Sequence, residues 1–178
     1  MIQTDDGPQK LTYAQYKAKK KPREVTYPLV TDNDAVAAFR LADVNLRKAK
    51  LSGEQQQIDA AQKAADEAEE AVREATLIFR LRALPRDVYA ELKAEHPPTE
   101  DDHAEQREYT GDAKAKAAWH TKTFGPALVS ACLVEPEVTA EEADEMRREW
   151  NEAEWNGLYG SAIGVNRDAT DTAGLVFS

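Results

Sequence analysis

Apolar residues recur at alternating spacings of three and four along two neighbouring stretches, which is the pattern of coiled-coil helices. The first stretch follows an N-cap sequence at Thr31–Asp34 and ends near Leu51, and the second runs from Glu54 to about Leu84. The apolar positions are Ala35, Phe39, Ala42, Leu46 and Ala49 in the first stretch, and Ile58, Ala61, Ala65, Ala68, Val72, Ala75 and Phe79 in the second. Because the connection is short, the two helices are predicted to fold back antiparallel. We interpret residues 31–84 as a helical hairpin arm.

Most positions of this coiled-coil pattern are alanine. Each alanine buries little apolar area, at roughly 25 cal/mol per Å². The arm is therefore expected to be weak at its tip and firmer near Phe39 and Phe79. The pattern fits two interpretations, a plain spacer or an element that binds a partner.

Residues 1–30 form a basic N-terminal segment with a short helix and an edge strand. Leu11–Lys21 is predicted to be the helix, and its lysines either face solvent or contact an acidic partner or acidic parts of the same chain. Alternating apolar residues predict a strand at Arg23–Leu29, where Pro28 lacks an N–H group and so indicates a sheet edge. A lone strand is not stable. It is expected to pair with another copy, with another protein, or not at all.

Residues 85–166 are interpreted as a small helical lobe, followed by a C-terminal tail at 167–178. Residues 96–118 are expected to form an acidic loop within the lobe. Helices are predicted at Arg86–Glu95, from Pro126 to just before Pro136, from a capping box at Thr139–Glu142 to Trp150, and at Glu152–Asn166. The predicted fold class is therefore all-α, with a long antiparallel αα-hairpin joined to a small helical lobe and one short N-terminal strand.

The composition describes an acidic protein with modest core-forming capacity. Apolar residues make up 42% of the chain, but many are alanine, and the net charge is -10. Nucleic-acid binders usually carry a basic face, and here only Lys10–Arg23 is basic, so no nucleic-acid partner is expected. A single cysteine excludes an intrachain disulfide and favours a reducing cytoplasm. No leader peptide and no membrane span are expected from the apolar runs.

Residues that could perform chemistry are few and scattered. His96, His103 and His120 lie far apart without metal-ligand spacing, and the favoured interpretation is that they are exposed. Cys132 sits in an apolar stretch without a neighbouring base, which indicates a buried core cysteine. Phosphate-binding loops, dinucleotide fingerprints and nucleophile elbows are not found in the sequence. We therefore predict a non-enzymatic protein with no catalytic residues, cofactor or metal.

Large apolar side chains gather in the last third of the chain. Most of them should form the core of the lobe, while those left at its rim are good anchors for a partner. The candidate partner-binding residues are Phe124, Leu128, Trp150, Trp155, Leu158 and Tyr159.

Three segments carry a resemblance to a known family. They are TLIFRLRALPRDVYAELKAEHPP at Thr76–Pro98, FGPALVSACLVEPEVTAEEADEM at Phe124–Met146 and EWNGLYGSAIGVN at Glu154–Asn166. In this order they resemble the tail assembly chaperones of long-tailed phages and prophages of actinobacteria. Together they cover about a third of the chain. The arm and both ends of the chain are not part of the resemblance.

The resemblance implies a small helical protein of the host cell cytoplasm that is absent from the mature virion. Such a protein binds the long, hydrophobic tape measure protein and keeps it soluble while tail tube subunits are recruited. Members of the family commonly occur as a short form and a frameshifted longer form, and this chain would be the short form. Tail tube protein and the longer form are the further partners that the resemblance implies.

Other functions fit the same sequence. A structural phage tail or head–tail connector component would use the hairpin for assembly. An acidic mimic of nucleic acid would need carboxylates spaced like phosphates on a rigid face. The single strand and the alanine-rich arm also make a homo-oligomer conceivable.

Overall fold

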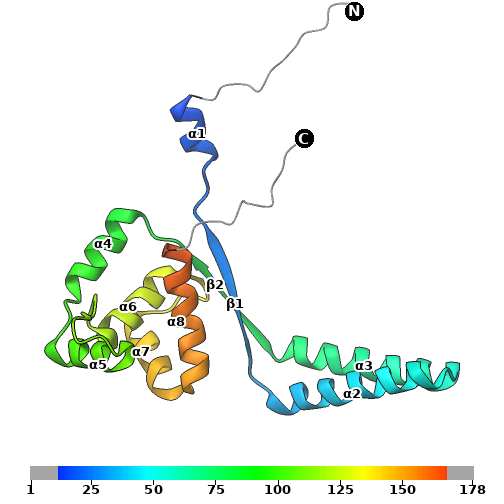
Figure 1. Cartoon of the computed structure of the whole chain (residues 1–178). Coiled ribbons are helices and arrows are strands. Elements are labelled where there is room, and N and C mark those ends of the chain that lie inside the picture. Colours follow the sequence, from blue (N-terminus) through cyan, green and yellow to red (C-terminus); the bar gives the residue numbers. More distant parts are fainter. Residues whose placement is uncertain (1–11, 168–178) are drawn as a thin grey trace, which may run out of the picture.

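The computed structural model describes residues 12–167, which form an elongated arm and a helical lobe joined by a narrow β-sheet (Figure 1). The helices are α1 (Tyr13–Lys19), α2 (Asn33–Ser52), α3 (Gln55–Glu74), α4 (Arg86–Glu95), α5 (Glu100–Thr110), α6 (Thr121–Cys132), α7 (Ala140–Glu149) and α8 (Glu152–Arg167). The strands are β1 (Glu24–Val30), β2 (Thr76–Arg82) and β3 (Leu133–Glu135). The prediction of an all-α fold with one strand is wrong, because the described residues combine helices with a three-stranded antiparallel sheet. The fold is mixed α and β.

The sheet corrects two predictions, since β2 lies where the second arm helix was expected to continue to Leu84. β2 is the central strand, flanked by β1 and β3, so the partner of β1 is another segment of the same chain. The pairing places Tyr27 of β1 opposite Phe79 of β2. Phe79 and Leu81 are buried while Arg80 and Arg82 are exposed, which is the two-residue period of a half-buried strand. This period overrides the helical spacing that ends at Phe79.

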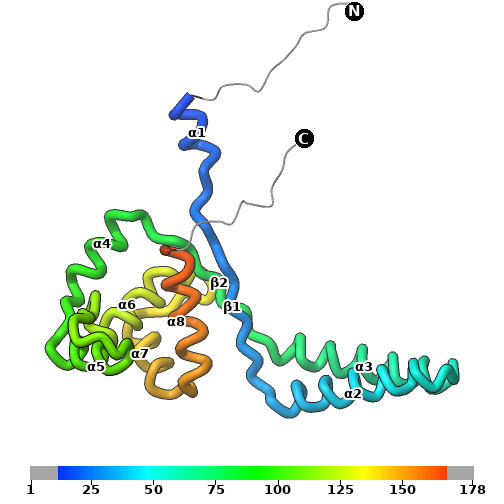
Figure 2. The backbone as a smooth tube through the Cα atoms, viewed as in Figure 1, coloured from blue at the N-terminus to red at the C-terminus, as the bar shows by residue number. Residues whose placement is uncertain are grey.

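The arm consists of α2 and α3, which form the predicted antiparallel hairpin (Figure 2). Asp32 caps α2 by accepting hydrogen bonds from Asp34 N at 2.8 Å and Ala35 N at 3.1 Å. Gly53 ends it in the left-handed conformation, with φ of 75°. The arm leaves the sheet where the Thr31 backbone N–H donates to the Ala75 carbonyl at 2.9 Å.

Few side chains are buried between the two arm helices. Only Leu46 and Ala49 of α2 and Ala65 of α3 are buried within the arm. Because alanine offers so little area, the arm gains little stability from its own core. The alanine-rich pattern thus buries little, as expected, but the expected gradient is wrong. Leu46 and Ala49 lie in the half of α2 near the tip, whereas Phe39 is only half-buried and Phe79 belongs to β2.

The lobe is built around β2 and two crossing helices, α6 and α8. Its buried core contains Phe79, Leu81, Phe124, Leu128, Val129, Cys132, Leu133, Ala143, Trp155, Leu158, Ala162 and Val165. Tyr27 packs against this core from β1, and its hydroxyl donates to the Glu154 carbonyl of α8 at 3.1 Å. The sheet therefore contributes directly to the core of the lobe.

Two predicted elements of the lobe differ from the structure. The acidic loop at 96–118 contains α5, which begins with a capping box between Thr99 and Asp102. α6 begins at Thr121, so Pro126 lies inside that helix rather than at its start. The predicted helices at Arg86–Glu95 and Glu152–Asn166 are confirmed, as is a short helix in Leu11–Lys21, where α1 spans Tyr13–Lys19. The predicted tail lies outside the described residues except for Arg167.

Substitution of Gly157 is expected to destabilise the lobe, because α8 crosses β1 at this residue. A Cβ atom added there would lie 2.6 Å from the Tyr27 hydroxyl oxygen, which is too close. Gly157→Ala should lower the free energy of unfolding by about 1–3 kcal/mol in urea denaturation. Gly160 is the matched control, since a Cβ there meets nothing within 4 Å. Gly160→Ala should leave stability unchanged or raise it by up to about 1 kcal/mol, and equal losses in the two variants would contradict the prediction.

Candidate partner-binding site

A groove on the surface of the lobe brings together three of the predicted partner-binding residues, Trp150, Trp155 and Tyr159. We call it the aromatic groove, and it has a volume of about 340 Å³. It is lined by Thr121, Lys122, Arg147, Trp150, Glu152, Trp155, Asn156 and Tyr159. The residues come from the start of α6, the end of α7 and the first half of α8. The groove therefore lies where three helices meet.

The aromatic rings of the groove are held in place by contacts beneath them. Trp155 and Tyr159, four residues apart on α8, stack with ring centroids 6.1 Å apart and planes 2° from parallel. Trp150 meets Phe79 of the sheet edge-on at 5.5 Å. The Trp119 indole N–H donates to the Tyr159 hydroxyl at 3.0 Å. Burial raises the pKa of Tyr159 to about 12, so the ring stays neutral in the physiological range.

The other three predicted residues have a different place in the structure. Phe124, Leu128 and Leu158 are completely buried in the lobe core. Phe124 supports the groove indirectly, because its ring lies 4.6 Å from the ring of Trp119, which donates to the Tyr159 hydroxyl. In this conformation the side chains of all three residues offer no surface to a partner.

Sequence reasoning missed the polar rim of the aromatic groove. Lys122 lies on the first turn of α6 and Arg147 on the last turn of α7, where the Arg147 Nη2 atom lies 2.8 Å from Asp144 Oδ1. Asn156 is exposed on α8 between the two aromatic rings in sequence. The one sequence signal for this rim was the position of Asn156 beside Trp155, because Lys122 and Arg147 come from separate helices. The rim therefore carries the positive charges of Lys122 and Arg147 and the negative charge of Glu152 around the aromatic rings.

The three histidines are half-buried and hydrogen-bonded, which corrects the expectation that they are exposed. The His120 Nδ1 atom lies 2.7 Å from Asp102 Oδ2, and the His96 Nδ1 atom lies 2.9 Å from the Thr123 hydroxyl. The His103 Nδ1 atom accepts from the Ala117 backbone N–H at 3.0 Å. Each imidazole ring thus helps to fix the position of the segment between α4 and α6 through a hydrogen bond.

Asp102 is the buried charged residue of this hydrogen-bonded segment. Burial alone raises its pKa, but hydrogen bonds from Thr99, His120 and Thr121 outweigh this and hold the pKa well below its usual range. The carboxylate accepts from Thr99 N at 2.8 Å, from the Thr99 hydroxyl at 2.7 Å and from Thr121 N at 3.2 Å. A carboxylate with several donors stays ionised and joins the start of α5 to the start of α6. Its role is structural.

Cys132 is fully buried, as predicted, at the end of α6. Burial raises the pKa of its thiol to about 11, although the Asn166 side-chain amide donates to the sulfur at 3.1 Å. A thiol with such a pKa is a poor nucleophile. Within residues 12–167, His, Cys, Asp and Glu side chains form no group of three that could hold a metal ion.

A basic cavity of about 760 Å³ lies where the chain enters β1 from α1. Lys20, Lys21, Arg23 and Arg86 line it, and none of its eleven described lining residues is acidic. The hydroxyl of Tyr89 is buried there without a hydrogen-bond partner among the described residues. Arg86 of α4 therefore adds one positive charge to those of Lys20, Lys21 and Arg23 around this cavity.

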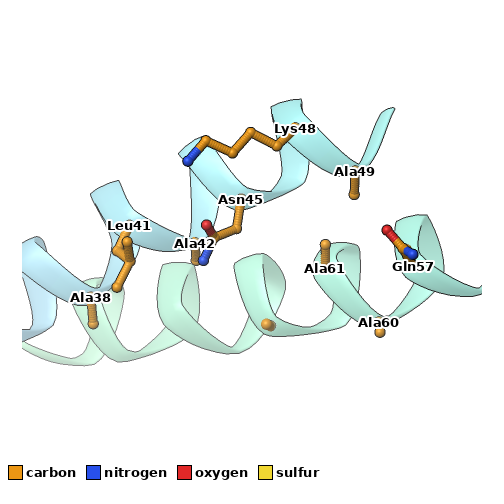
Figure 3. Close-up of a pocket in the computed structure, with 10 residues that line it drawn as sticks. Ala38, Leu41, Ala42, Asn45, Lys48, Ala49, Gln57, Ala60 and Ala61 are labelled. Carbon is orange, nitrogen blue, oxygen red and sulfur yellow. The ribbon is translucent and has the colours of Figure 1, made fainter. Parts of the chain in front are cut away.

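The arm carries a shallow groove of its own, which we call the arm groove (Figure 3). It has a volume of about 630 Å³ and follows one face of α2 and α3. Its lining residues are Ala38, Leu41, Ala42, Asn45, Lys48, Ala49, Gln57, Ala60, Ala61 and Ala64. Six of the ten are alanine, so the backbones of both helices are open to close approach.

The chain matches no protein-family model, no curated protein and no solved structure. In the part of the chain that the structure describes, no helix is long and apolar enough to cross a membrane.

Proposed function

We propose that this protein is a phage tail assembly chaperone that binds the tape measure protein and keeps it soluble during tail tube assembly. The observation that supports the proposal best is the aromatic groove, where Trp150, Trp155 and Tyr159 line one surface groove. Tryptophan and tyrosine anchors in grooves between helices are typical of sites that bind an amphipathic helix. A long tape measure helix offers such apolar faces repeatedly.

The remaining surface suits a binding role that does not require a reaction. The net charge of -10 keeps a complex with an apolar partner soluble. Our proposal gives no catalytic task to Cys132, whose thiol is buried, or to Asp102, whose role is structural. We place the protein in the host cytoplasm and outside the mature virion, with tail tube protein and a longer frameshifted form as further partners.

Co-expression with the tape measure protein tests this proposal. The wild-type chain should move most of the tape measure protein into the soluble fraction. Asn156→Arg should return most of it to the pellet, because a large cation would fill the aromatic groove without touching the core. Ala153→Arg is the matched control on the same helix, since Ala153 is exposed and does not line the groove.

The results distinguish a failure of the chaperone function from a failure of the aromatic groove as its site. A tape measure protein that stays insoluble with wild-type chain in excess would refute the chaperone function. Equal solubility with Asn156→Arg and Ala153→Arg would keep the function but remove the aromatic groove as its site. Circular dichroism of both variants checks that the lobe remains folded.

A structural phage tail or head–tail connector component is the second candidate, and the projecting arm favours it. α2 and α3 extend away from the lobe as an assembly element would (Figure 1). Mass spectrometry of purified virions separates the two functions. A structural component is present in stoichiometric amounts, whereas a chaperone is missing.

A further inference from the structure

We propose that the basic cavity beside β1 is a binding site for a small molecule that carries two linked phosphates. The inference goes beyond the chaperone function and does not depend on it. It rests on the charges that line this cavity, on hydrogen-bond donors that have no acceptor there, and on the size of the cavity.

Positive side chains reach the cavity from two segments of the chain. Lys20, Lys21 and Arg23 lie in the connection from α1 to β1, and Arg86 is the first residue of α4. The end of α8 lies beside the start of β1 (Figure 1), and Arg23 Nη1 donates to the Gly164 carbonyl of α8 at 3.5 Å. A ligand in the cavity would therefore meet positive charge from two sides, in a chain whose net charge is -10.

The carboxylates next to these cations in sequence are engaged elsewhere. The positive charge of Lys21 acts on Glu24, but the Glu24 carboxylate accepts from Arg82 Nε at 2.7 Å. The Asp87 carboxylate accepts from the Val88 backbone N–H at 3.0 Å. Neither Glu24 nor Asp87 lines the cavity. The described lining therefore contains no carboxylate that would neutralise its positive charge.

The start of α4 brings backbone donors to the same cavity. The N-cap of α4 is Pro85, which provides no side-chain acceptor for the first backbone N–H groups of the helix. Pro85 and Arg86 both line the cavity. Free N–H groups at the start of a helix attract phosphate oxygens, and the guanidinium group of an arginine can donate to two such oxygens at once. This combination favours phosphate as the anion.

The hydroxyl of Tyr89 is a further donor without an acceptor. It is buried and has no hydrogen-bond partner among the described residues, and Tyr89 lines the cavity. Burial raises the pKa of Tyr89, while the positive charge of Arg167 acts in the opposite direction. The hydroxyl therefore keeps its proton at neutral pH. Because it is closed to solvent, a phosphate oxygen would reach it only after side chains of the cavity wall move, and it would then gain the acceptor that it lacks.

The size of the cavity favours a small molecule over a nucleic acid. Its volume of about 760 Å³ lies within the range of about 300–1,000 Å³ that is common for small-molecule sites. Ala83, Leu84 and Val165 add apolar surface for the organic part of such a molecule. A nucleic acid would instead need positive charge along several successive phosphates, and the net charge of -10 opposes its approach.

Isothermal titration calorimetry of the full chain with sodium pyrophosphate at physiological ionic strength tests the proposal. Wild-type protein should bind pyrophosphate at one site. Arg86→Ala should weaken binding about tenfold or more, because it removes a charged donor from the cavity. Arg40→Ala is the matched control, since it removes the same charge from an exposed position of α2 that does not line the cavity, and it should change the affinity less than about twofold. No binding by wild type, or equal affinity of the two variants, would overturn the proposal.

Tyr89→Phe separates a ligand-binding role of the hydroxyl from a structural one. The variant removes a donor that has no partner, so the unliganded protein should be at least as stable as wild type in thermal denaturation. Its affinity for pyrophosphate should fall about threefold or more. A loss of stability together with unchanged affinity would overturn the place of this hydroxyl in the proposed site.

Two other anions test the choice of ligand. Citrate carries carboxylates in place of phosphates, and a single-stranded oligothymidylate carries its phosphates along a polymer. Both should bind more weakly than pyrophosphate in the same titration. Equal or tighter binding of citrate would overturn the assignment to phosphate, and tighter binding of the oligothymidylate would overturn the assignment to a small molecule.

Discussion

Phe124→Ala is expected to lower the free energy of unfolding by about 3–5 kcal/mol, the cost of removing a large aromatic side chain from a well-packed core. Phe124 is completely buried on α6. Its ring contacts the rings of Trp119, Tyr89 and His96, with centroids 4.6, 6.2 and 6.1 Å away. One substitution would therefore leave a cavity between three elements. Urea denaturation followed by tryptophan fluorescence measures the loss.

Tyr109→Ala is the control for Phe124→Ala, because it removes a comparable ring from a helix surface. Tyr109 is 90% exposed at the end of α5. Its loss should change the free energy of unfolding by less than about 0.5 kcal/mol. A loss below about 1 kcal/mol for Phe124→Ala would contradict its central place in the core. Both variants can be measured without a binding partner, because only their stabilities are compared.

The helical hairpin could be predicted from sequence because its signals are local. A three–four spacing of apolar residues, an N-cap at Asp32 and a left-handed glycine at Gly53 all lie within the segment they describe. The sheet depends on residues that are far apart. Phe79 of β2 fits the preceding helical pattern, and only the pairing of β2 with β1 and β3 shows that this segment is extended. Tertiary pairing thus overrides a local helical spacing.

The difference between local signals and contacts of distant residues also explains how much of the candidate site could be predicted. The richness of the last third in large apolar residues predicted six contact residues, but sequence alone does not separate a ring in the core from a ring at its rim. Trp150 and Tyr159 remain partly exposed, while Phe124 and Leu158 do not, because α6 and α8 cross at these buried positions. Exposure is a property of how helices cross. It could not be derived before the crossing was known.

The histidines and Asp102 show a further limit of prediction from sequence. Their sequence separation indicated isolated, exposed side chains, yet the turn before α6 brings His120 against Asp102. The capping box between Thr99 and Asp102 was readable as a Thr-x-x-Asp pattern, although the acidic composition of that stretch favoured a loop. Helix α5 forms because its acidic residues gather in the first turn, where the helix dipole stabilises negative charge.

Asp102→Asn is expected to destabilise the protein at neutral pH and to make it less sensitive to acid. An amide presents an NH₂ group where the carboxylate presents an oxygen. One of the donors from Thr99, His120 or Thr121 would therefore face another donor. Hydrogen bonds to a buried charge contribute about 1.5–3 kcal/mol each. The variant should lose a similar amount of its free energy of unfolding at pH 7.

The pH dependence of this loss follows from the lowered pKa of Asp102. Its pKa in the folded protein lies below the value of about 3.9 in an unfolded chain. The ionised carboxylate therefore stabilises the fold above about pH 4, and this contribution is lost as the pH falls through the folded-state pKa. Urea denaturation of wild type and Asp102→Asn should show a constant gap between pH 5 and 7 that narrows below about pH 4. Asp101→Asn, an exposed neighbour in the same turn, should show no such gap, and a gap of constant size down to pH 2 would contradict the assignment.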